Sequence, residues 1–459
     1  MRTFGIQSYS FLVFIIVILI LVLIPIVSFN YSAILILLFW LAAVTWLSFS
    51  GSTIHCIFLV VWGLFFVIPM NFLNTDVFLM NGVFLNGMFL NKSEITLFLV
   101  SIFIFVASYF VTSINIYQPL DSSFKKRKLR YRPLFFVLLA ICLAVVINFN
   151  YLEAKSIYDD GYMTLFIGDA SVTKGLGILL VEQMLISLML ILFYNNRNIA
   201  VFCWLAYSLS IMLIGQRIPA FFLIVSIIII YFELTGRKMP IISAAILGIL
   251  FASPLLMFIQ DFRTSGINPL ENFDLQRYYL DIWNVVAISS DTLKAVIVLD
   301  NMEIYVSPFA KVLNLVDVFL NRIFDIDLIT EYHGFGAVYS EVLDPNLAAT
   351  GVTFASSSIA EAMHHGGLLF IIFIGIFTSI CSNYLHKILA SGKFMYLMIF
   401  IIIFPKFIGS VRNDMLGWLF EGLIYLALVL PFAFVLEKIF LSNSSLRTGI
   451  IITDRKKII

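Results

Sequence analysis

Long apolar runs recur from one end of this 459-residue chain to the other, and short polar turns separate them. Many of these runs reach about eighteen residues, which as a helix is long enough to cross the ~30 Å hydrocarbon core of a bilayer. The chain is 61% hydrophobic and only 12% charged, whereas soluble domains are about a quarter charged. The pattern therefore predicts an all-α polytopic membrane protein and excludes a soluble globular domain.

Hydropathy and run length together predict about twelve membrane-spanning helices. The polar turn Ser28-Phe29-Asn30 is short, so we expect the first two spans to form a tight helical hairpin. The expected spans cover residues 11–27, 31–48, 54–72, 94–115, 133–150, 176–194, 199–214, 218–234, 240–259, 367–385, 394–411 and 415–436.

Basic residues indicate how the spans are oriented. A cluster lies in the loop between the fourth and fifth spans, and the positive-inside rule places such a loop in the cytoplasm. Counting spans from that loop places both termini, and every other basic cluster, on the same cytoplasmic side. The clustered residues are Lys125, Lys126, Arg127, Lys128, Arg130 and Arg132 in the loop, and Arg197, Arg237, Lys238, Lys387, Lys393, Arg447, Arg455, Lys456 and Lys457 elsewhere.

The same count divides the chain into three regions. Residues 1–259 hold the first nine spans, residues 260–357 form one large outer loop, and residues 358–459 hold the last three spans and a cytoplasmic tail. A shorter outer loop is expected at 151–175. Within the large loop, apolar residues recur at helical spacing from Val312 to Phe324, which predicts an amphipathic helix. We expect a folded helical cap whose helix either lies in the membrane interface or packs on the spans.

Three arginines break the positive-inside pattern, because Arg217, Arg263 and Arg412 each fall at an outer span end. One alternative is that each side chain snorkels to lipid head groups. The other is a shared ligand site, since ionisable groups at membrane depth tend to face a cavity or a substrate path. Guanidinium groups match phosphate geometry, so the cluster favours a phosphate-bearing ligand. Asp261 and Asp414 each lie two residues from an arginine and are expected as supporting salt-bridge partners.

A polar segment closes the large loop at the start of the tenth span. Ser358 and Glu361 match a capping box, which would by itself explain both residues. It does not explain His364 and His365, which follow Glu361 by three and four residues and can share its helix face. A carboxylate beside an imidazole can act as an acid–base unit, so Glu361 and His364 are the candidate catalytic residues, with His365 in support. The Gly366–Gly367 pair would allow another backbone or a sugar to approach closely.

No metal or cofactor is expected. The four cysteines all lie inside apolar runs without paired spacing, so they indicate neither a metal site nor a disulfide framework. Glu361, His364 and His365 are residue types that bind zinc, but their spacing matches no zinc motif. The chain also has no Walker-type or Rossmann glycine pattern. We expect no nucleic-acid partner.

With these residues in hand, the chain resembles the O-antigen polysaccharide polymerase family of the Wzy type. The resemblance lies partly in the architecture, which combines many spans with one large outer loop in the second half of the chain. It also lies in the outer arginines, including Gly215-Gln216-Arg217, and in the run from Ser357 to Glu361 that Gly366 follows. The histidines at 364 and 365 depart from the family pattern, which usually has Tyr, Phe or Asn there.

The resemblance implies a membrane glycosyltransferase with a fold of the C type at the periplasmic face of a bacterial inner membrane. Its donor would be an oligosaccharide repeat unit on undecaprenyl diphosphate, and the growing chain would move to the next lipid-linked unit. Membrane lipid and a chain-length regulator protein are the other expected partners. In this scheme Arg217, Arg263 and Arg412 bind the diphosphate, while Glu361 or His364 accepts the proton of the acceptor hydroxyl.

Two other functions fit parts of the pattern. An O-antigen ligase resembles the polymerase in its spans, its outer arginines and a loop histidine, which here would be His333, His364 or His365. A flippase or secondary transporter would have a similar number of spans. Transporters of that kind often show internal repeats and charges near the midplane, whereas these halves show no repeat and the unusual charges lie at outer span ends. A transporter would also leave the large outer loop unexplained.

Overall fold

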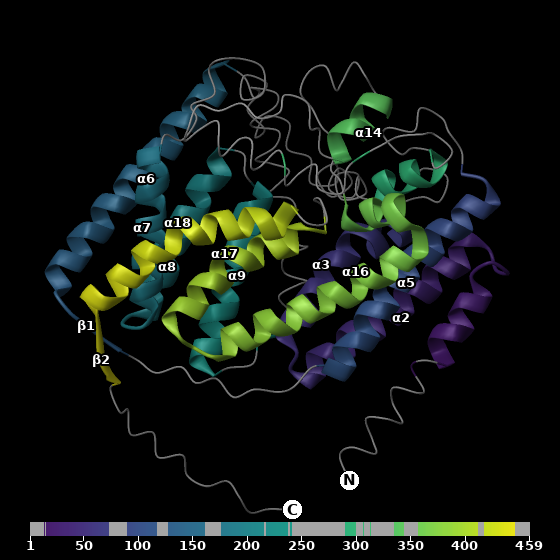
Figure 1. The fold of residues 1–459 in the computed structure, drawn as a ribbon, viewed down its shortest axis with the longest axis horizontal. Coiled ribbons are helices and arrows are strands. Elements are labelled where there is room, and N and C mark those ends of the chain that lie inside the picture. The colour runs from purple at the N-terminus through teal and green to yellow at the C-terminus, as the bar shows by residue number, and fades with distance from the viewer. Residues whose placement is uncertain are drawn as a thin grey trace, which may run out of the picture.

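The computed structural model describes the helical part of the chain and its short connections (Figure 1). The described residues are 13, 15–72, 90–116, 127–160, 176–214, 217–236, 239–240, 290–299, 306, 313, 335–343, 357–411 and 417–445. The expected ninth span at 240–259 lies outside them, apart from its first residue. Of the amphipathic helix expected from Val312 to Phe324, the structure describes one residue.

Ten of the expected spans are helices in the structure: six are long and apolar enough to cross a membrane, and four are shorter apolar helices. Residues 15–23 of the expected first span are also helical. The prediction of a helical, multi-pass membrane protein is therefore confirmed, while the count of twelve spans stays a prediction. The helices are α2 (Phe29–Ser50), α3 (Thr53–Phe72), α5 (Lys92–Ile116), α6 (Arg132–Asp160), α7 (Leu176–Phe193), α8 (Arg197–Leu213), α9 (Arg217–Thr235), α16 (Ser358–Ala390), α17 (Phe394–Gly409) and α18 (Gly417–Phe440).

Three helix boundaries differ from the expectation. The first turn lies at residues 24–27, and α2 already begins at Phe29, because Pro25 disfavours helix at the residue before it. Helix α6 continues to Asp160, so the first part of the loop expected at 151–175 is helical. Helix α16 begins at Ser358, ahead of the expected span start at residue 367. Hydropathy marks where apolar sequence ends, whereas a helix can continue into the polar interface.

The described residues also include two short strands, so the fold is almost all helical, as expected, with one small addition. Strand β1 (Arg127–Leu129) pairs antiparallel with β2 (Leu441–Ser445), with Leu129 opposite Leu441. The backbone N–H of Arg130 donates to the carbonyl of Phe440 at 2.8 Å, and the Arg127 guanidinium forms an ion pair with Glu437. This two-stranded β-ribbon, β1 with β2, thus joins the basic loop before α6 to the end of α18.

The basic turns lie at one end of the helical bundle. The ribbon joins the turn at 127–132 to the end of α18, and the Tyr194 hydroxyl donates to the carbonyl of Gly392 at 2.7 Å. That second contact joins the turn between α7 and α8 to the turn between α16 and α17. We call this the basic end. The prediction that these basic clusters share one side is confirmed for the residues that the structure describes.

Helices α5 and α16 run parallel and pack along their length. At one end the Ser101 hydroxyl lies 4.0 Å from the sulfur of Met363, and towards the basic end the hydroxyls of Ser113 and Ser379 lie 2.9 Å apart. A Cβ at Gly375 would lie only 2.0 Å from a side-chain oxygen of α5. Small and hydroxylated residues therefore let the two backbones approach closely, as is typical of helix packing in membranes.

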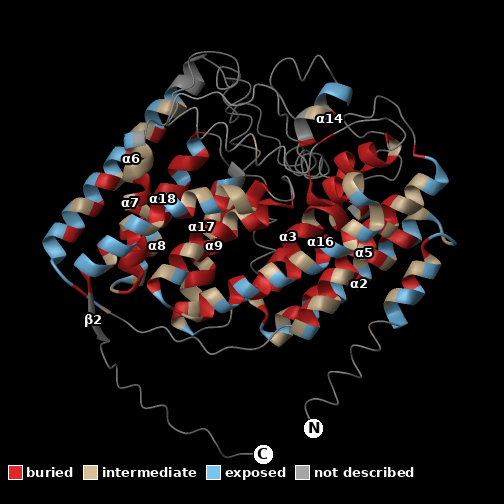
Figure 2. Cartoon of the chain, viewed as in Figure 1, coloured by how far each residue is buried: buried red, intermediate tan, exposed pale blue. Residues whose placement is uncertain are grey.

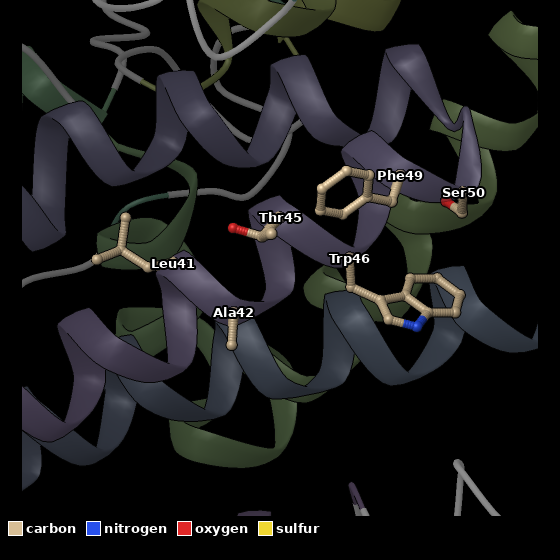
Figure 3. Close-up of a pocket in the computed structure, with 6 residues that line it drawn as sticks. All are labelled: Leu41, Ala42, Thr45, Trp46, Phe49 and Ser50. Atoms are coloured by element: carbon tan, nitrogen blue, oxygen red, sulfur yellow. The ribbon is translucent and has the colours of Figure 1, made fainter.

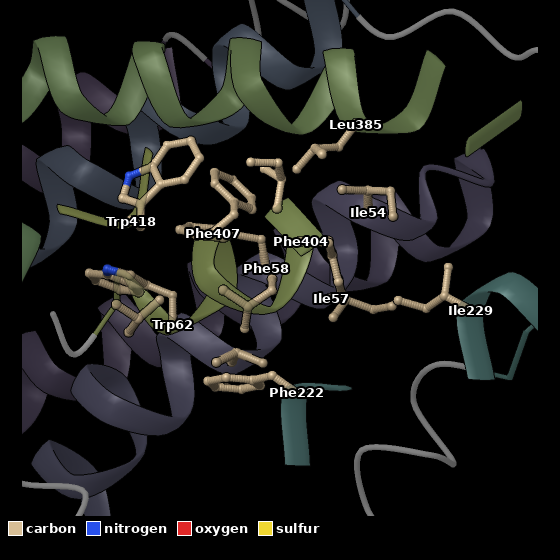
Figure 4. Packing of buried hydrophobic residues seen from close by; sticks show 14 of the residues in the cluster. Ile54, Ile57, Phe58, Trp62, Phe222, Ile229, Leu385, Phe404, Phe407 and Trp418 are labelled. Carbon is tan, nitrogen blue, oxygen red and sulfur yellow. The ribbon is translucent and has the colours of Figure 1, made fainter. Parts of the chain in front are cut away.

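Aromatic side chains fill the centre of the bundle, where α3, α9, α17 and α18 meet (Figure 4). The rings of Phe58 and Phe407 are 4.9 Å apart between centroids, and Phe407 in turn packs edge-on against Trp418 at 5.2 Å. Exposed residues lie instead on the outward faces of α2, α6 and α8 (Figure 2), and many of them are large and apolar. In a soluble protein such faces would be a liability, but in a bilayer they contact lipid.

Candidate functional site

The first turn of α16 shows that Glu361 is not a capping residue. Ser357 occupies the N-cap position, and its Oγ accepts a hydrogen bond from the backbone N–H of Ala360 at 3.1 Å. The capping box expected from Ser358 and Glu361 is therefore wrong by one residue, because the helix begins one position earlier than that pairing requires. The Glu361 side chain is buried, with 3% of the residue exposed. Capping does not explain this buried carboxylate.

His365 is the histidine that the structure places against Glu361. Its Nε2 lies 4.0 Å from Oε1 of Glu361, one helical turn away. This distance permits an electrostatic interaction but is too long for a direct hydrogen bond. Among the described residues, Nε2 of His365 has no hydrogen-bond partner. A small shift of either side chain would bring the carboxylate and the imidazole into hydrogen-bond contact.

His364 points instead towards the large loop. Helix α14 (Phe335–Leu343) lies over the start of α16 (Figure 1), and the Tyr339 hydroxyl lies 3.2 Å from Nδ1 of His364. The ring of Phe335 packs edge-on against the same imidazole, with centroids 5.5 Å apart. Phe335 and Tyr339 are each 1% exposed. The two histidines thus have different neighbours. His365 faces Glu361, whereas His364 contacts α14 of the large loop.

Gly367 separates the short first segment of α16 from its long apolar segment. It has φ 59° and ψ −150°, a region of backbone conformation that is essentially restricted to glycine. A Cβ added at Gly367 would meet no atom within 4 Å, whereas one at Gly366 would lie 2.8 Å from Cβ of Phe370 in the same helix. The described residues therefore show no close approach by a second backbone at this pair. The glycine at 367 is needed for the kink.

A buried ion pair lies in the part of the large loop that the structure describes at 290–299. Nζ of Lys294 donates to Oδ1 of Asp291 at 2.7 Å, and the two side chains are 1% and 4% exposed. The Ser290 hydroxyl donates to the backbone carbonyl of Phe65 in α3 at 3.0 Å, and Lys294 lies 6.0 Å from the ring centroid of Phe98 in α5. This loop segment is therefore inserted against the same end of α5 as the start of α16.

Neither this pair nor Tyr339 was predicted from the sequence. A signal for the pair was available, because Asp291 and Lys294 are spaced three residues apart in an otherwise apolar stretch and can meet on one helix face. Tyr339 follows Phe335 at the four-residue spacing of a helix face. Neither spacing indicates which part of the chain it will contact, and only the tertiary structure places these residues beside α16 and α5.

Of the five residues expected at the diphosphate site, the structure describes one. Arg217 is the first residue of α9, while Arg263 and Arg412, with Asp261 and Asp414, lie outside the described residues. Helix α9 packs against α17. Helices α8 and α17 each begin at a basic turn, so α9 starts, and α17 ends, at the opposite end of the bundle. Arg217 therefore begins its helix at the end of the bundle where α17 finishes and leads to Arg412.

A further cation lies at this same end. Lys406 is in the last turn of α17 and forms an ion pair with Glu421 of α18. Its Nζ also lies 4.3 Å from the ring centroid of Tyr425. Lys406 lies inside an apolar run in the sequence, so it was not predicted as one of the outer cations.

The described part of the chain contains no group of three or more potential metal ligands. A hollow of about 690 Å³ lies on one face of α2 (Figure 3). Its lining residues are Leu41, Ala42, Thr45, Trp46, Phe49 and Ser50. Phe49 is 82% exposed, and the lining is mostly apolar, as expected for a lipid-facing surface. None of the candidate site residues lines this hollow.

The helices and their exposed apolar faces define a multi-pass membrane protein. Comparison with family models then identifies the group: the model for the O-antigen polysaccharide polymerase Wzy matches residues 6–443. The match covers nearly the whole chain, so the protein belongs to this family, and the resemblance noted in the sequence is confirmed. No curated protein and no solved structure matches the chain.

Proposed function

We propose that this protein is an O-antigen polymerase that joins oligosaccharide repeat units carried on undecaprenyl diphosphate. The growing chain is transferred from its lipid carrier to the next lipid-linked unit at the periplasmic face of the bacterial inner membrane. The family assignment supports polymerase activity. The observation that carries the site assignment is the buried Glu361, which lies beside His365 and is not used as a helix cap.

In the proposed reaction the acceptor sugar hydroxyl attacks the anomeric carbon of the donor chain. The new glycosidic C–O bond forms as the bond between the anomeric carbon and the diphosphate oxygen breaks. Glu361 accepts the hydroxyl proton, and the lipid diphosphate leaves with the bonding electron pair. A general base must lie within hydrogen-bond reach of the proton that it removes. Its neighbour His365 can stabilise the carboxylate, and His364 positions the large loop through Tyr339.

Arg217, Arg263 and Arg412 bind the diphosphate and stabilise the negative charge that develops on it as it leaves. Positively charged donors that are already in place are among the largest contributions to such a reaction. Arg217 at the start of α9 supports this role, because α9 packs on the helix that leads to Arg412. Asp261 and Asp414 would hold their neighbouring arginines in place. No metal or cofactor takes part in this scheme.

The proposed membrane topology follows from the basic end of the bundle. The clustered turns at 127–132, 194–197 and 391–393 support a cytoplasmic position for that end, with both termini there and twelve spans in total. The loop 260–357 and the start of α16 then face the periplasm, where the flipped lipid-linked units are available. We propose a glycosyltransferase fold of the C type, and a chain-length regulator protein as a partner within the membrane.

Deletion of the gene in its native strain tests the proposed function. A polymerase deletion should reduce the lipopolysaccharide ladder on a silver-stained gel to core plus a single repeat unit, and a plasmid copy should restore it. Loss of the single-unit band as well would indicate a ligase or a flippase. An unchanged ladder would contradict the proposal.

Replacing Arg217 tests the diphosphate site. Loss of one electrostatic donor typically costs ~100- to 1000-fold in rate, so Arg217→Ala should abolish long polymer while the protein still accumulates in the membrane. Arg197→Ala is a matched control, because Arg197 is likewise the first residue of a helix, α8, but lies at the basic end. Normal polymer length with Arg217→Ala would rule out this role.

A further inference from the structure

Lys406 is held between a carboxylate and an aromatic ring. Its ammonium group forms an ion pair with Glu421 and lies 4.3 Å from the ring centroid of Tyr425. The Lys406 side chain is 21% exposed and that of Glu421 is 41% exposed. The pair is therefore open on one side and is not sealed inside the bundle.

Among the described residues, Lys294 also lies over an aromatic ring, but it is buried in the ion pair with Asp291. The position of Lys406 distinguishes it from the three remaining lysines that lie over aromatic rings. Each of those lies at or near the basic end, where the positive-inside rule accounts for it, whereas Lys406 is in the last turn of α17, at the end where α9 begins. The other pairs are Lys387 with Tyr384 at 5.7 Å, Lys393 with Tyr396 at 5.5 Å and Lys438 with Phe434 at 5.4 Å.

The stem of Lys406 is fixed by the close packing of α17 and α18. A Cβ at Gly422 would lie 2.4 Å from Cδ1 of Ile403 and 3.9 Å from Cδ of Lys406. Helix α18 therefore lies directly against the aliphatic part of the side chain, and the ammonium group at its tip is the part that can change partners. Lysine side chains commonly place an apolar stem along protein and a charged tip in a polar environment.

We propose that Lys406 is a further diphosphate-binding residue and that Glu421 and Tyr425 hold it in place until the lipid diphosphate arrives. The proposal rests on the polymerase function proposed above and adds a cation to Arg217, Arg263 and Arg412. The pair is partly open on the Glu421 side, so a diphosphate, which carries more negative charge than one carboxylate, can displace Glu421. Tyr425 then keeps contact with the ammonium through its ring face.

Binding of undecaprenyl diphosphate to the full-length protein in phosphatidylcholine nanodiscs tests this proposal. Lys406→Gln should weaken binding about 10- to 100-fold, the range expected for loss of one hydrogen bond to a charged group. Lys406→Arg, which keeps the charge, should retain most of the affinity. Lys438→Gln is the matched control and should bind as the wild type does, because Lys438 has a similar aromatic contact at the basic end. Unchanged binding by Lys406→Gln would overturn the proposal.

Glu421→Gln separates a ligand-binding lysine from a merely structural ion pair. If Lys406 changes partners, removing the competing carboxylate should leave diphosphate binding unchanged or make it tighter, opposite to the effect of Lys406→Gln. A structural pair predicts instead that both substitutions lower the unfolding temperature similarly and weaken binding alike. That result would overturn the proposal, as would a failure of Lys406→Arg to preserve binding.

A second titration distinguishes the lipid-linked substrate from bulk anionic lipid. Phosphatidylglycerol in the same nanodiscs should compete poorly with undecaprenyl diphosphate if the diphosphate group is recognised. Equal dependence of both lipids on Lys406 would mean that the lysine only snorkels to head groups. The gene deletion is read separately: an unchanged polysaccharide ladder would refute the polymerase function even if Lys406 bound the diphosphate.

Discussion

The hydroxyl of Tyr339 lies 3.2 Å from Nδ1 of His364, and this contact joins helix α14 of the large loop to the first segment of α16. Both residues pack with Phe335, so the loop covers the segment that holds Glu361. The candidate site is therefore formed by two regions of the chain. Substitutions in the loop should affect the reaction even where they do not touch the carboxylate.

Tyr339→Phe removes this hydroxyl and keeps the ring. A hydrogen bond of this kind contributes about 0.5–1.5 kcal/mol to stability, so we expect a small loss of thermal stability and a lower yield of long polymer. The hydroxyl should have no effect when His364 is already Phe, which a double-mutant cycle of unfolding measurements can show. Tyr396→Phe is the control, because Tyr396 is 41% exposed and follows a basic turn. Additive effects of the two substitutions would contradict the contact.

Ser357→Ala and Glu361→Gln should have opposite effects on stability and on polymerisation. Ser357 caps α16, so its loss should cost about 1 kcal/mol of stability and leave polymerisation largely intact. Glu361→Gln should keep the stability of the protein but abolish long polymer, because an amide cannot accept the proton. Thermal unfolding in detergent and the polysaccharide ladder measure the two effects. Polymer formation by Glu361→Gln would remove Glu361 from the proposed reaction.

Gly367→Ala should be destabilising through the backbone alone. Strained conformations of this kind cost of order 1–3 kcal/mol for a residue with a Cβ, although a Cβ at this position would meet no neighbour. Gly177→Ala in α7 is the matched control, since a Cβ there also meets nothing within 4 Å and alanine favours a helix. We expect a lower unfolding temperature for the first variant and an equal or higher one for the second.

Lys294→Met should be strongly destabilising because it removes the cation that neutralises buried Asp291. Breaking a buried ion pair from one side typically costs about 3–5 kcal/mol. Replacing both residues, as in Asp291→Leu with Lys294→Met, should recover much of that loss because no buried charge remains. Detergent-solubilised protein yield and thermal unfolding report on this difference. A double variant less stable than either single variant would show that the pair is needed for another reason.

Much of the fold could be predicted from sequence because the bilayer imposes simple rules. Ten helices fall where apolar runs predicted them, since an apolar segment in lipid must satisfy its backbone hydrogen bonds within a helix. Helix capping and strand pairing were harder to predict from the sequence. The N-cap is Ser357 and not the predicted Ser358, because the start of a helix depends on local backbone geometry. Strands β1 and β2 pair although they lie more than three hundred residues apart in the chain.

The sequence by itself determined the class of protein, the helical segments, the shared side of the basic turns and the segment from Ser357 to His365 as a place of interest. Those properties follow from composition and local spacing. Only the tertiary structure decided that His364 contacts Tyr339 and that Lys406 meets Glu421 and Tyr425. Such contacts depend on how distant helices pack, and the side-chain periodicity of one helix contains no information about which helix will lie beside it.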